Sequence, residues 1–215
     1  MSEQKPLKML MMHGYHQSAA SYRVKVGGIR KKIKKRCEYV WFDAPHAVPD
    51  SEDFGWWFSH PGKYDAIAYT DFDEGFDASI EYMAKVFKEQ GPFDGILSFS
   101  QGACLAAILC CLKEKGDERF QGFDFAIIGA GYKSRQSQHA KYYEDVKVTI
   151  PTVHTIGETD GVIPKEMSHD LLSIFDPDQT KVATHDKGHL IPAAAEAKTI
   201  LIDFLDEMLK RKSSK

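Results

Sequence analysis

The chain has 215 residues, of which 43% are hydrophobic and 27% charged, and its formal net charge is −3. These values are ordinary for a soluble globular protein and predict a single domain over residues 1–215 with a sizeable core. The small negative charge argues against a general attraction to nucleic acid. No apolar run approaches the roughly 18 residues that a membrane-spanning helix needs.

The sequence also indicates where the protein resides. The N-terminal residues MSEQKPLK are polar and lack the apolar core of a signal peptide. Ser2 follows Met1 in place of the glycine that N-myristoylation requires. The cysteines form no C-x-x-C pair, which predicts reduced and mostly buried thiols; they are Cys37, Cys104, Cys110 and Cys111. We therefore expect a cytoplasmic protein.

Strands and helices alternate along the chain, according to the spacing of its apolar residues. In chain order the sequence predicts a strand at 7–14, a helix at 18–36, a strand at 37–45, a helix at 74–90, a strand at 93–99, a helix at 101–114, strands at 123–131 and 151–160, a helix at 164–175, a strand at 180–186 and a helix at 192–211. Residues 44–74 and 132–150 are expected to be irregular. This order predicts an α/β fold of about six mostly parallel strands with helices on both faces.

The helix expected at 18–36 contains a basic run, RKKIKKR. Ser18 is expected to cap this helix, and the inner face is expected to carry Val24, Ile29 and Ile33. The lysines then point outward, so the run is interpreted as a solvated helix face. A nucleic-acid site would need a more basic domain with interleaved aromatic residues.

Four loops follow predicted strands, at 13–18, 98–102, 157–164 and 185–192. Sites in open parallel sheets lie at the carboxyl ends of the strands. The side chains of these loops are therefore expected to meet at one edge of the sheet.

The stretch FDGILSFSQGACLAA (93–107) has a serine between a predicted strand and a predicted helix. This is the setting of the nucleophile elbow, Gly-x-Ser-x-Gly, in which a strained turn projects the serine above the sheet. Here Ser100 is the central serine and Gly102 the second glycine, while Ser98 replaces the first. The alternative is a helix N-terminus that is merely capped by a serine.

A serine nucleophile needs a general base, usually histidine, and a carboxylate that orients it. Asp160 follows a predicted strand and suits the acid, although it could simply form an Asx-turn. Glu158 and Asp178 are less suitable, because one lies near the strand end and the other in a separate turn. In THDKGHLIP (184–192), the sequence favours His189, beside a glycine, over His185, which is still in the strand. An isolated loop histidine could also be purely structural.

The order Ser100, Asp160, His189 resembles that of the α/β-hydrolase superfamily. More narrowly, the chain is similar to a family of serine hydrolases found in fungi and animals. The stretches that carry this resemblance are LMMHGYHQS, FDAPHAVP, WWFS, GPFDGILSFSQGA, IPTVHTIGETDGVIP and GHLIPA. The family's Phe-Ser-Gln-Gly elbow is present at 99–102, and Ser98 departs from the glycine of many members. The resemblance implies a hydrolase sheet without its first strands and without a large cap domain.

The resemblance also implies an oxyanion hole of two backbone N–H groups. One would come from Gln101, directly after the nucleophile. The other would come from the loop after the first strand and is assigned to Tyr15, with His16 as the alternative. His13 is interpreted as a structural loop histidine.

An acyl-binding wall is expected from aromatic side chains near this edge. Trp56, Trp57 and Phe58 lie in the long segment FGWWFSHPGKY, and Phe99 precedes the nucleophile. The alternative role of the loop aromatics is to anchor the segment by packing in the core.

These features together predict a serine carboxylesterase that cleaves small acyl esters through a Ser-His-Asp triad and an acyl-enzyme. Thioesters are the nearest alternative substrates, and a non-catalytic hydrolase-like binding protein is the alternative of another class. The histidines show no metal-ligand spacing, so no metal or organic cofactor is expected. No nucleic-acid partner or membrane span is expected, and the protein would be a monomer or homodimer.

Overall fold

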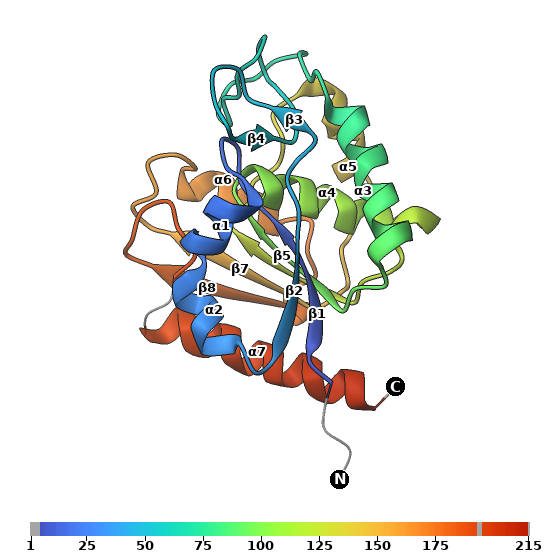
Figure 1. The fold of residues 1–215 in the computed structure, drawn as a ribbon, viewed down its shortest axis with the longest axis vertical. Coiled ribbons are helices and arrows are strands. Elements are labelled where there is room, and N and C mark those ends of the chain that lie inside the picture. Colours follow the sequence, from blue (N-terminus) through green and yellow to red (C-terminus); the bar gives the residue numbers. More distant parts are fainter. Residues whose placement is uncertain (1–4, 193–194, 215) are drawn as a thin grey trace.

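Six parallel strands form the central sheet in the order β2-β1-β5-β6-β7-β8 (Figure 1). The computed structural model describes residues 5–192 and 195–214. The strands are β1 (Leu7–Met12), β2 (Cys37–Trp41), β5 (Gly95–Phe99), β6 (Phe125–Gly129), β7 (Thr152–Gly157) and β8 (Thr180–His185). Parallel neighbours need crossover connections, and helices supply most of them here. The α/β fold expected from the alternation is confirmed.

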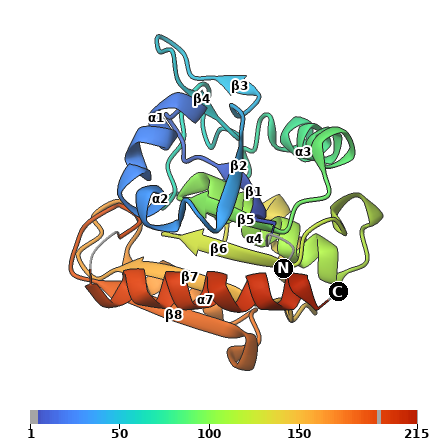
Figure 2. The same cartoon turned by 60° about the horizontal axis from the view of Figure 1, so that its bottom comes forward.

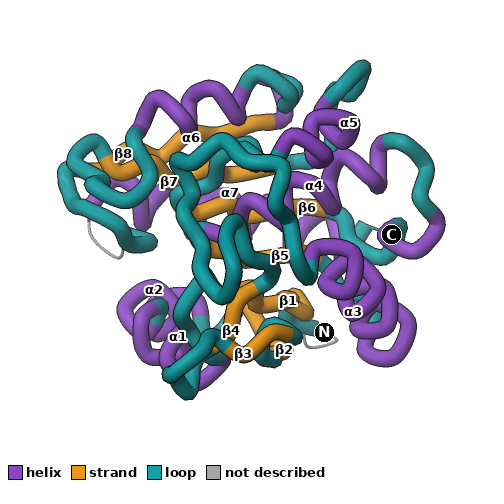
Figure 3. Tube along the Cα trace, turned by 90° about the horizontal axis from the view of Figure 1, so that it is seen from above, coloured by secondary structure: helices purple, strands orange, loops and turns teal. Residues whose placement is uncertain are grey.

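The helices cover both faces of the sheet. They are α1 (Ala19–Lys25), α2 (Gly27–Ile33), α3 (Phe76–Gln90), α4 (Gln101–Glu114), α5 (Ala140–Tyr143), α6 (Lys165–Leu172) and α7 (Ala195–Ser213). Figures 1 and 2 show α1, α2 and α7 on one face, with α3, α4 and α6 on the other. The carboxyl ends of all six strands therefore meet at one edge, and the loops above that edge dominate the view in Figure 3.

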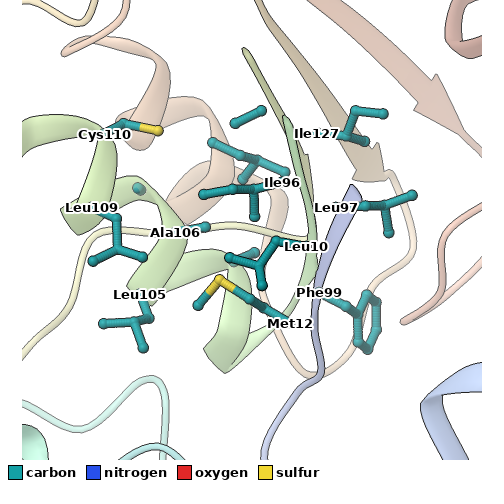
Figure 4. Close-up of a cluster of buried hydrophobic side chains, with 14 of the residues drawn as sticks. Leu10, Met12, Ile96, Leu97, Phe99, Leu105, Ala106, Leu109, Cys110 and Ile127 are labelled. Atoms are coloured by element: carbon teal, nitrogen blue, oxygen red, sulfur yellow. The ribbon is translucent and has the colours of Figure 1, made fainter. Parts of the chain in front are cut away.

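The centre of the core lies between β5 and α4. Side chains alternate along a strand, so Ile96 points toward α4 while Leu97 and Phe99 point to the opposite face (Figure 4). The α4 side chains from Gln101 to Cys111 are all buried. A helix that is apolar on all sides is stable only inside a core. The element that follows Ser100 is thus held by packing all around it.

The four cysteines are free and buried, in agreement with the sequence-based expectation. Burial raises the pKa of the Cys111 thiol to about 12, as it does for Cys37. Only the thiolate is nucleophilic, so these cysteines are unsuited to attack a substrate at neutral pH.

The region predicted as one helix at 18–36 is instead two helices that meet at Val26. Ser18 caps α1 as expected, with its side chain and that of Ser21 forming a capping box. Val24 is 80% exposed, so its assignment to the inner face is wrong. The buried stripe consists of Tyr22, Val26, Ile29 and Ile33. Its spacing of four, three and four residues is that of one helical face, and Val24 lies off it.

The two segments expected to be irregular contain short elements. Residues 44–74 include the antiparallel pair β3 (His46–Ala47) and β4 (Phe54–Gly55). The 132–150 segment holds the 3₁₀ turn η2 (Ser137–His139) and then α5. The remaining 3₁₀ turns are η1 (Glu118–Phe120) and η3 (Pro177–Gln179). These elements have two to four residues, which is too short for apolar periodicity to reveal.

Gly102 allows α4 to pack tightly against the end of β1. A methyl group added at Gly102 would overlap the backbone carbonyls of His13 and Met12. Gly102→Ala should therefore lower the free energy of unfolding by about 1–3 kcal/mol or more, because backbone cannot move aside cheaply. Gly27 lies at the start of α2 with open space around it, so Gly27→Ala should cost no stability. Urea unfolding of both variants checks this, and equal midpoints would contradict it.

Candidate active site

Ser100 lies on a strained turn between β5 and α4. Its backbone has φ 54° and ψ −120°, a region that residues other than glycine rarely adopt. The turn is held by the Ser100 N–H, which donates to the Gly129 carbonyl at 2.9 Å. Among the described residues, the Ser100 side chain makes no capping hydrogen bond to α4. Its hydroxyl is therefore directed to another partner, and the helix-cap interpretation is wrong.

Ser98 is fully buried and has a different role. Its hydroxyl donates to the Ile127 carbonyl of the neighbouring strand β6 at 3.0 Å. A serine at this elbow position keeps the side chain small and satisfies its own polar group inside the sheet. Of the two serines, only Ser100 presents its hydroxyl to the loops above the sheet edge.

The structure brings Ser100, Asp160 and His189 into one hydrogen-bonded row. His189 Nδ1 lies 2.7 Å from Asp160 Oδ2, and His189 Nε2 lies 2.9 Å from Ser100 Oγ. A carboxylate only accepts, so the row places a proton on Nδ1 and leaves the Nε2 lone pair for the serine hydroxyl. The Asp160 carboxylate is 2% exposed and the His189 side chain 17%, so the acid is the more sheltered of the two, while Ser100 and His189 line the neighbouring cavity.

The loop after β7 fixes the Asp160 carboxylate. Oδ1 accepts the N–H groups of Val162 and Ile163 at 2.8 and 2.9 Å, which leaves Oδ2 for His189. Burial by itself would raise the pKa of Asp160, but the hydrogen bonds from His189 and from the two N–H groups outweigh it. The pKa is lowered overall, so the group stays ionised. Asp160 therefore forms the Asx-turn that was its alternative role and also contacts His189, because the two interactions use different carboxylate oxygens.

The competing candidates lie elsewhere. Glu158 is exposed and pairs with Lys165 Nζ at 2.8 Å. Asp178 is exposed in the turn η3. His185 is the last residue of β8, as expected.

The loop after β1 approaches Ser100 closely. A methyl group added at Gly14 would lie 3.1 Å from Ser100 Cβ. Gly14 N donates to Gln17 Oε1 at 2.8 Å, which braces the turn that carries Tyr15. His13 accepts the Ala44 N–H at Nε2 and lies 2.7 Å from the Gly14 carbonyl at Nδ1, so it is part of the loop framework.

The side chain of Gln101 connects the elbow to the long loop, which the sequence did not reveal. Its Oε1 accepts the Trp56 N–H at 2.9 Å, and its Nε2 donates to the Trp57 carbonyl at 2.8 Å. The backbone N–H of Gln101 belongs to the first turn of α4. N–H groups of a first turn have no partner within the helix.

A cavity of about 580 Å³ opens beside Ser100 and His189. Its other lining residues are Gly14, Tyr15, His16, Gln17, Lys25, Tyr64, Asp65, Ala66, Ile67, Phe99, Gly161 and Val162. The Phe99 ring also packs against His189 at a tilt of 48°, with 4.5 Å between ring centroids. The expectation that Phe99 lies beside the nucleophile in the pocket wall agrees with this geometry.

The prediction that Trp56 and Trp57 line this pocket is wrong. Both indoles are completely buried, and their N–H groups donate to the His13 carbonyl and to Gln136 Oε1. Phe58 is also buried and packs edge-on against Tyr15 rather than lining the cavity. The aromatic triplet anchors the long loop, which was the alternative role. The aromatic wall consists of Tyr15, Tyr64 and Phe99.

The chain matches a known protein family over most of its length. The model of the family described as "Serine hydrolase (FSH1)" matches residues 1–200. The chain belongs to this serine hydrolase family. "Esterase OVCA2" of Xenopus tropicalis is 42% identical, with 97% of this chain and 96% of the relative aligned. The human Esterase OVCA2 is 35% identical, with 96% and 99% aligned. The protein is therefore a serine hydrolase of a family whose named relatives are esterases.

Solved structures share the fold at low sequence identity. The crystal structure of esterase PE8 has a TM-score of 0.64 at 16% identity, covering 96% of this chain and 95% of that one. The Zea mays acyl-protein thioesterase 2 has a TM-score of 0.61 at 14% identity, covering 97% and 96%. Both likenesses concern the α/β-hydrolase fold alone.

The described residues contain neither a membrane-spanning helix nor a cluster of metal ligands. Within 5–192 and 195–214, no helix combines the length and apolar character of a membrane span. No three His, Cys, Asp or Glu side chains in that same part of the chain gather closely enough to hold a metal ion.

The burial of Trp57 changes what its removal should do. Trp57→Ala should lower the free energy of unfolding by about 3–5 kcal/mol and reduce kcat/KM equally for short and long esters. Ile67, which is 50% exposed in the cavity wall, provides the contrast. Ile67→Ala should leave the free energy of unfolding nearly unchanged. It should lower kcat/KM for long-chain esters more than for acetate esters. Urea unfolding and kcat/KM as a function of acyl chain length check both variants. A loss of kcat/KM in Trp57→Ala that grows with chain length would contradict the conclusion that Trp57 lies outside the pocket.

Proposed function

We propose that the protein is a carboxylesterase in which Ser100 attacks the ester carbonyl. The observation that carries this proposal is the row from Asp160 through His189 to Ser100, with both contacts below 3.0 Å. A serine hydroxyl becomes a useful nucleophile when a histidine accepts its proton as the bond to carbon forms. Ser100 Oγ would attack, and its proton would pass to His189 Nε2.

The negative charge that develops on the carbonyl oxygen needs preorganised donors. The proposed donors are the backbone N–H groups of Gln101 and Tyr15. The first lies at the start of α4, where the helix dipole also favours negative charge. The second lies in a loop that Gln17 braces beside Ser100.

The reaction then proceeds in two balanced halves. The tetrahedral intermediate would expel the alcohol, which takes the proton from His189 and leaves an acyl group on Ser100. Water would attack this acyl-enzyme, giving its proton to His189 as it adds, and His189 would return that proton to Ser100 as the acid departs. Asp160 would remain ionised and stabilise the imidazolium in both halves.

A thioester is the second candidate substrate class, because the same steps cleave it with a thiol as the leaving group. Rates on an ester and a thioester of the same acyl group compare the two classes directly. A non-catalytic protein of this fold would hydrolyse neither.

The two serines of the elbow provide the test. Ser100→Ala should lower kcat by at least about 10⁴-fold, because without the nucleophile only binding and the oxyanion donors assist water. Ser98→Ala should keep most activity and lose about 1 kcal/mol of stability with its hydrogen bond to Ile127. Hydrolysis of p-nitrophenyl esters by both folded variants measures this. An active Ser100→Ala protein would overturn the proposal.

A further inference from the structure

Lys25 places a positive charge in the wall of the cavity beside Ser100. Its Nζ lies 4.2 Å from the centroid of the Phe99 ring, and that ring also contacts His189. Among the described residues, no carboxylate forms an ion pair with Lys25. The Lys25 ammonium is thus close to Ser100 and His189, where it can form an ion pair with an anionic ligand.

The aromatic contact is a reason for this lysine to remain in place. A cation over a ring face gains roughly 0.5–1 kcal/mol at an exposed site, which orders the side chain without neutralising it. Partial burial lowers the pKa of Lys25, while the carboxylate of Asp160 acts in the opposite direction. The field of Asp160 therefore reaches this ammonium from the site itself.

The segment from Ser18 to Arg36, which contains α1 and α2, adds to the positive potential around Lys25. Between residues 18 and 36 the chain has eight lysines and arginines and no aspartate or glutamate, although the whole chain carries −3. Arg36 pairs with Asp206. The other side chains that form this basic face are Arg23, Lys25, Arg30, Lys31, Lys32, Lys34 and Lys35. Of this set Lys25 lines the cavity, and the other cations contribute only to the longer-range potential that attracts anionic ligands.

Besides Lys25 and His189, the cavity lining contains two side chains that can carry charge near neutral pH, His16 and Asp65. His16 Nδ1 contacts Asp53 at 2.9 Å. Asp65 accepts the N–H of Ile67 at 2.9 Å, which orients its exposed carboxylate without neutralising it. Of the lysines and arginines in the described residues, Lys25 alone lines this cavity, so it is the cation that an anionic ligand can meet there.

We propose that Lys25 and the basic face of α1 and α2 form an anion subsite, so that the preferred substrates are esters carrying a carboxylate or phosphate. This inference rests on the proposed ester hydrolysis and names its substrate class. The anion could belong to the acyl part, as in a half-ester of a dicarboxylic acid, or to the alcohol part. Both sources use the same chemistry, an anionic oxygen that accepts from the Lys25 ammonium.

Two isosteric pairs of esters separate these sources. Monoethyl glutarate has its carboxylate on the acyl side, and ethyl 5-methylhexanoate replaces that carboxylate by an isopropyl group. The ester 3-(butanoyloxy)propanoate has it on the alcohol side, and isopentyl butanoate is its neutral counterpart. Within each pair, the ratio of kcat/KM for the anionic ester to that for the neutral ester isolates the charge.

The wild-type ratio should exceed one for at least one pair, and that pair identifies the side that holds the anion. Lys25→Met should lower this ratio about five- to tenfold. This loss lies between the contribution of an exposed ion pair and that of a hydrogen bond to a charged group. Lys25→Arg should retain most of it. Raising the salt concentration from about 0.02 M to about 0.5 M should reduce the wild-type ratio, because screening weakens the attraction.

Lys113 provides the matched control. Its ammonium also lies over an aromatic ring, that of Phe123, at 5.2 Å, but it does not line this cavity. Lys113→Met should leave the ratio unchanged. A Lys25→Met protein with the wild-type ratio would overturn the subsite, as would wild-type ratios at or below one for both pairs.

A binding measurement keeps this inference separate from the proposed reaction. In a Ser100→Ala background, ligand-observed NMR measures binding of monoethyl glutarate and 3-(butanoyloxy)propanoate with Lys25 present or replaced by methionine. Weaker binding of either anion on replacement supports the subsite even if no ester is hydrolysed, in which case the proposed reaction alone fails. Equal binding of both anions contradicts the subsite.

Discussion

The left-handed backbone of Ser100 is the constraint on which the rest of the site depends. A non-glycine residue with φ 54° carries strain, and such strain persists only where the surroundings over-determine it. Here β5 is paired on both sides, with β1 and β6, and α4 is buried from its first residue through Cys111. Neither element can move to relax the turn. Gly102 allows α4 to pack closely against the end of β1, and the hydroxyl at the tip of the turn is directed away from the core.

The partners of Ser100 come from two loops at the same edge, and each is fixed by its own local bonds. The Asp160 carboxylate is fully used, with one oxygen on the turn N–H groups and the other on His189. The contact between the carboxylate and Nδ1 sets the histidine tautomer, which in turn determines what the ring can do for the serine. The loop that carries Tyr15 is braced separately by Gln17. The long 44–74 segment connects to these parts through the Gln101 side chain and the His13 carbonyl, and it completes the cavity wall.

The sequence predicted the features that depend on short-range chemistry. Alternating apolar runs gave the six strands, and the turn residues around Ser100, Asp160 and His189 marked the loops that meet at the sheet edge. The inner face of α1 was misassigned because Tyr22 and Val26 were left out of the stripe. Trp56 and Trp57 were placed in the pocket because buried and exposed loop aromatics look alike in sequence. Their burial is accompanied by tertiary hydrogen bonds to the His13 carbonyl and to Gln136, which no local pattern encodes.

Covalent labelling by a fluorophosphonate tests the central claim most directly, because such probes react with a serine that a neighbouring base has activated. Peptide mass analysis of the labelled, folded protein should find one adduct, on Ser100, and His189→Ala should slow its formation greatly. An adduct on another residue would contradict the account, as would an unlabelled Ser100 in protein whose fold is intact.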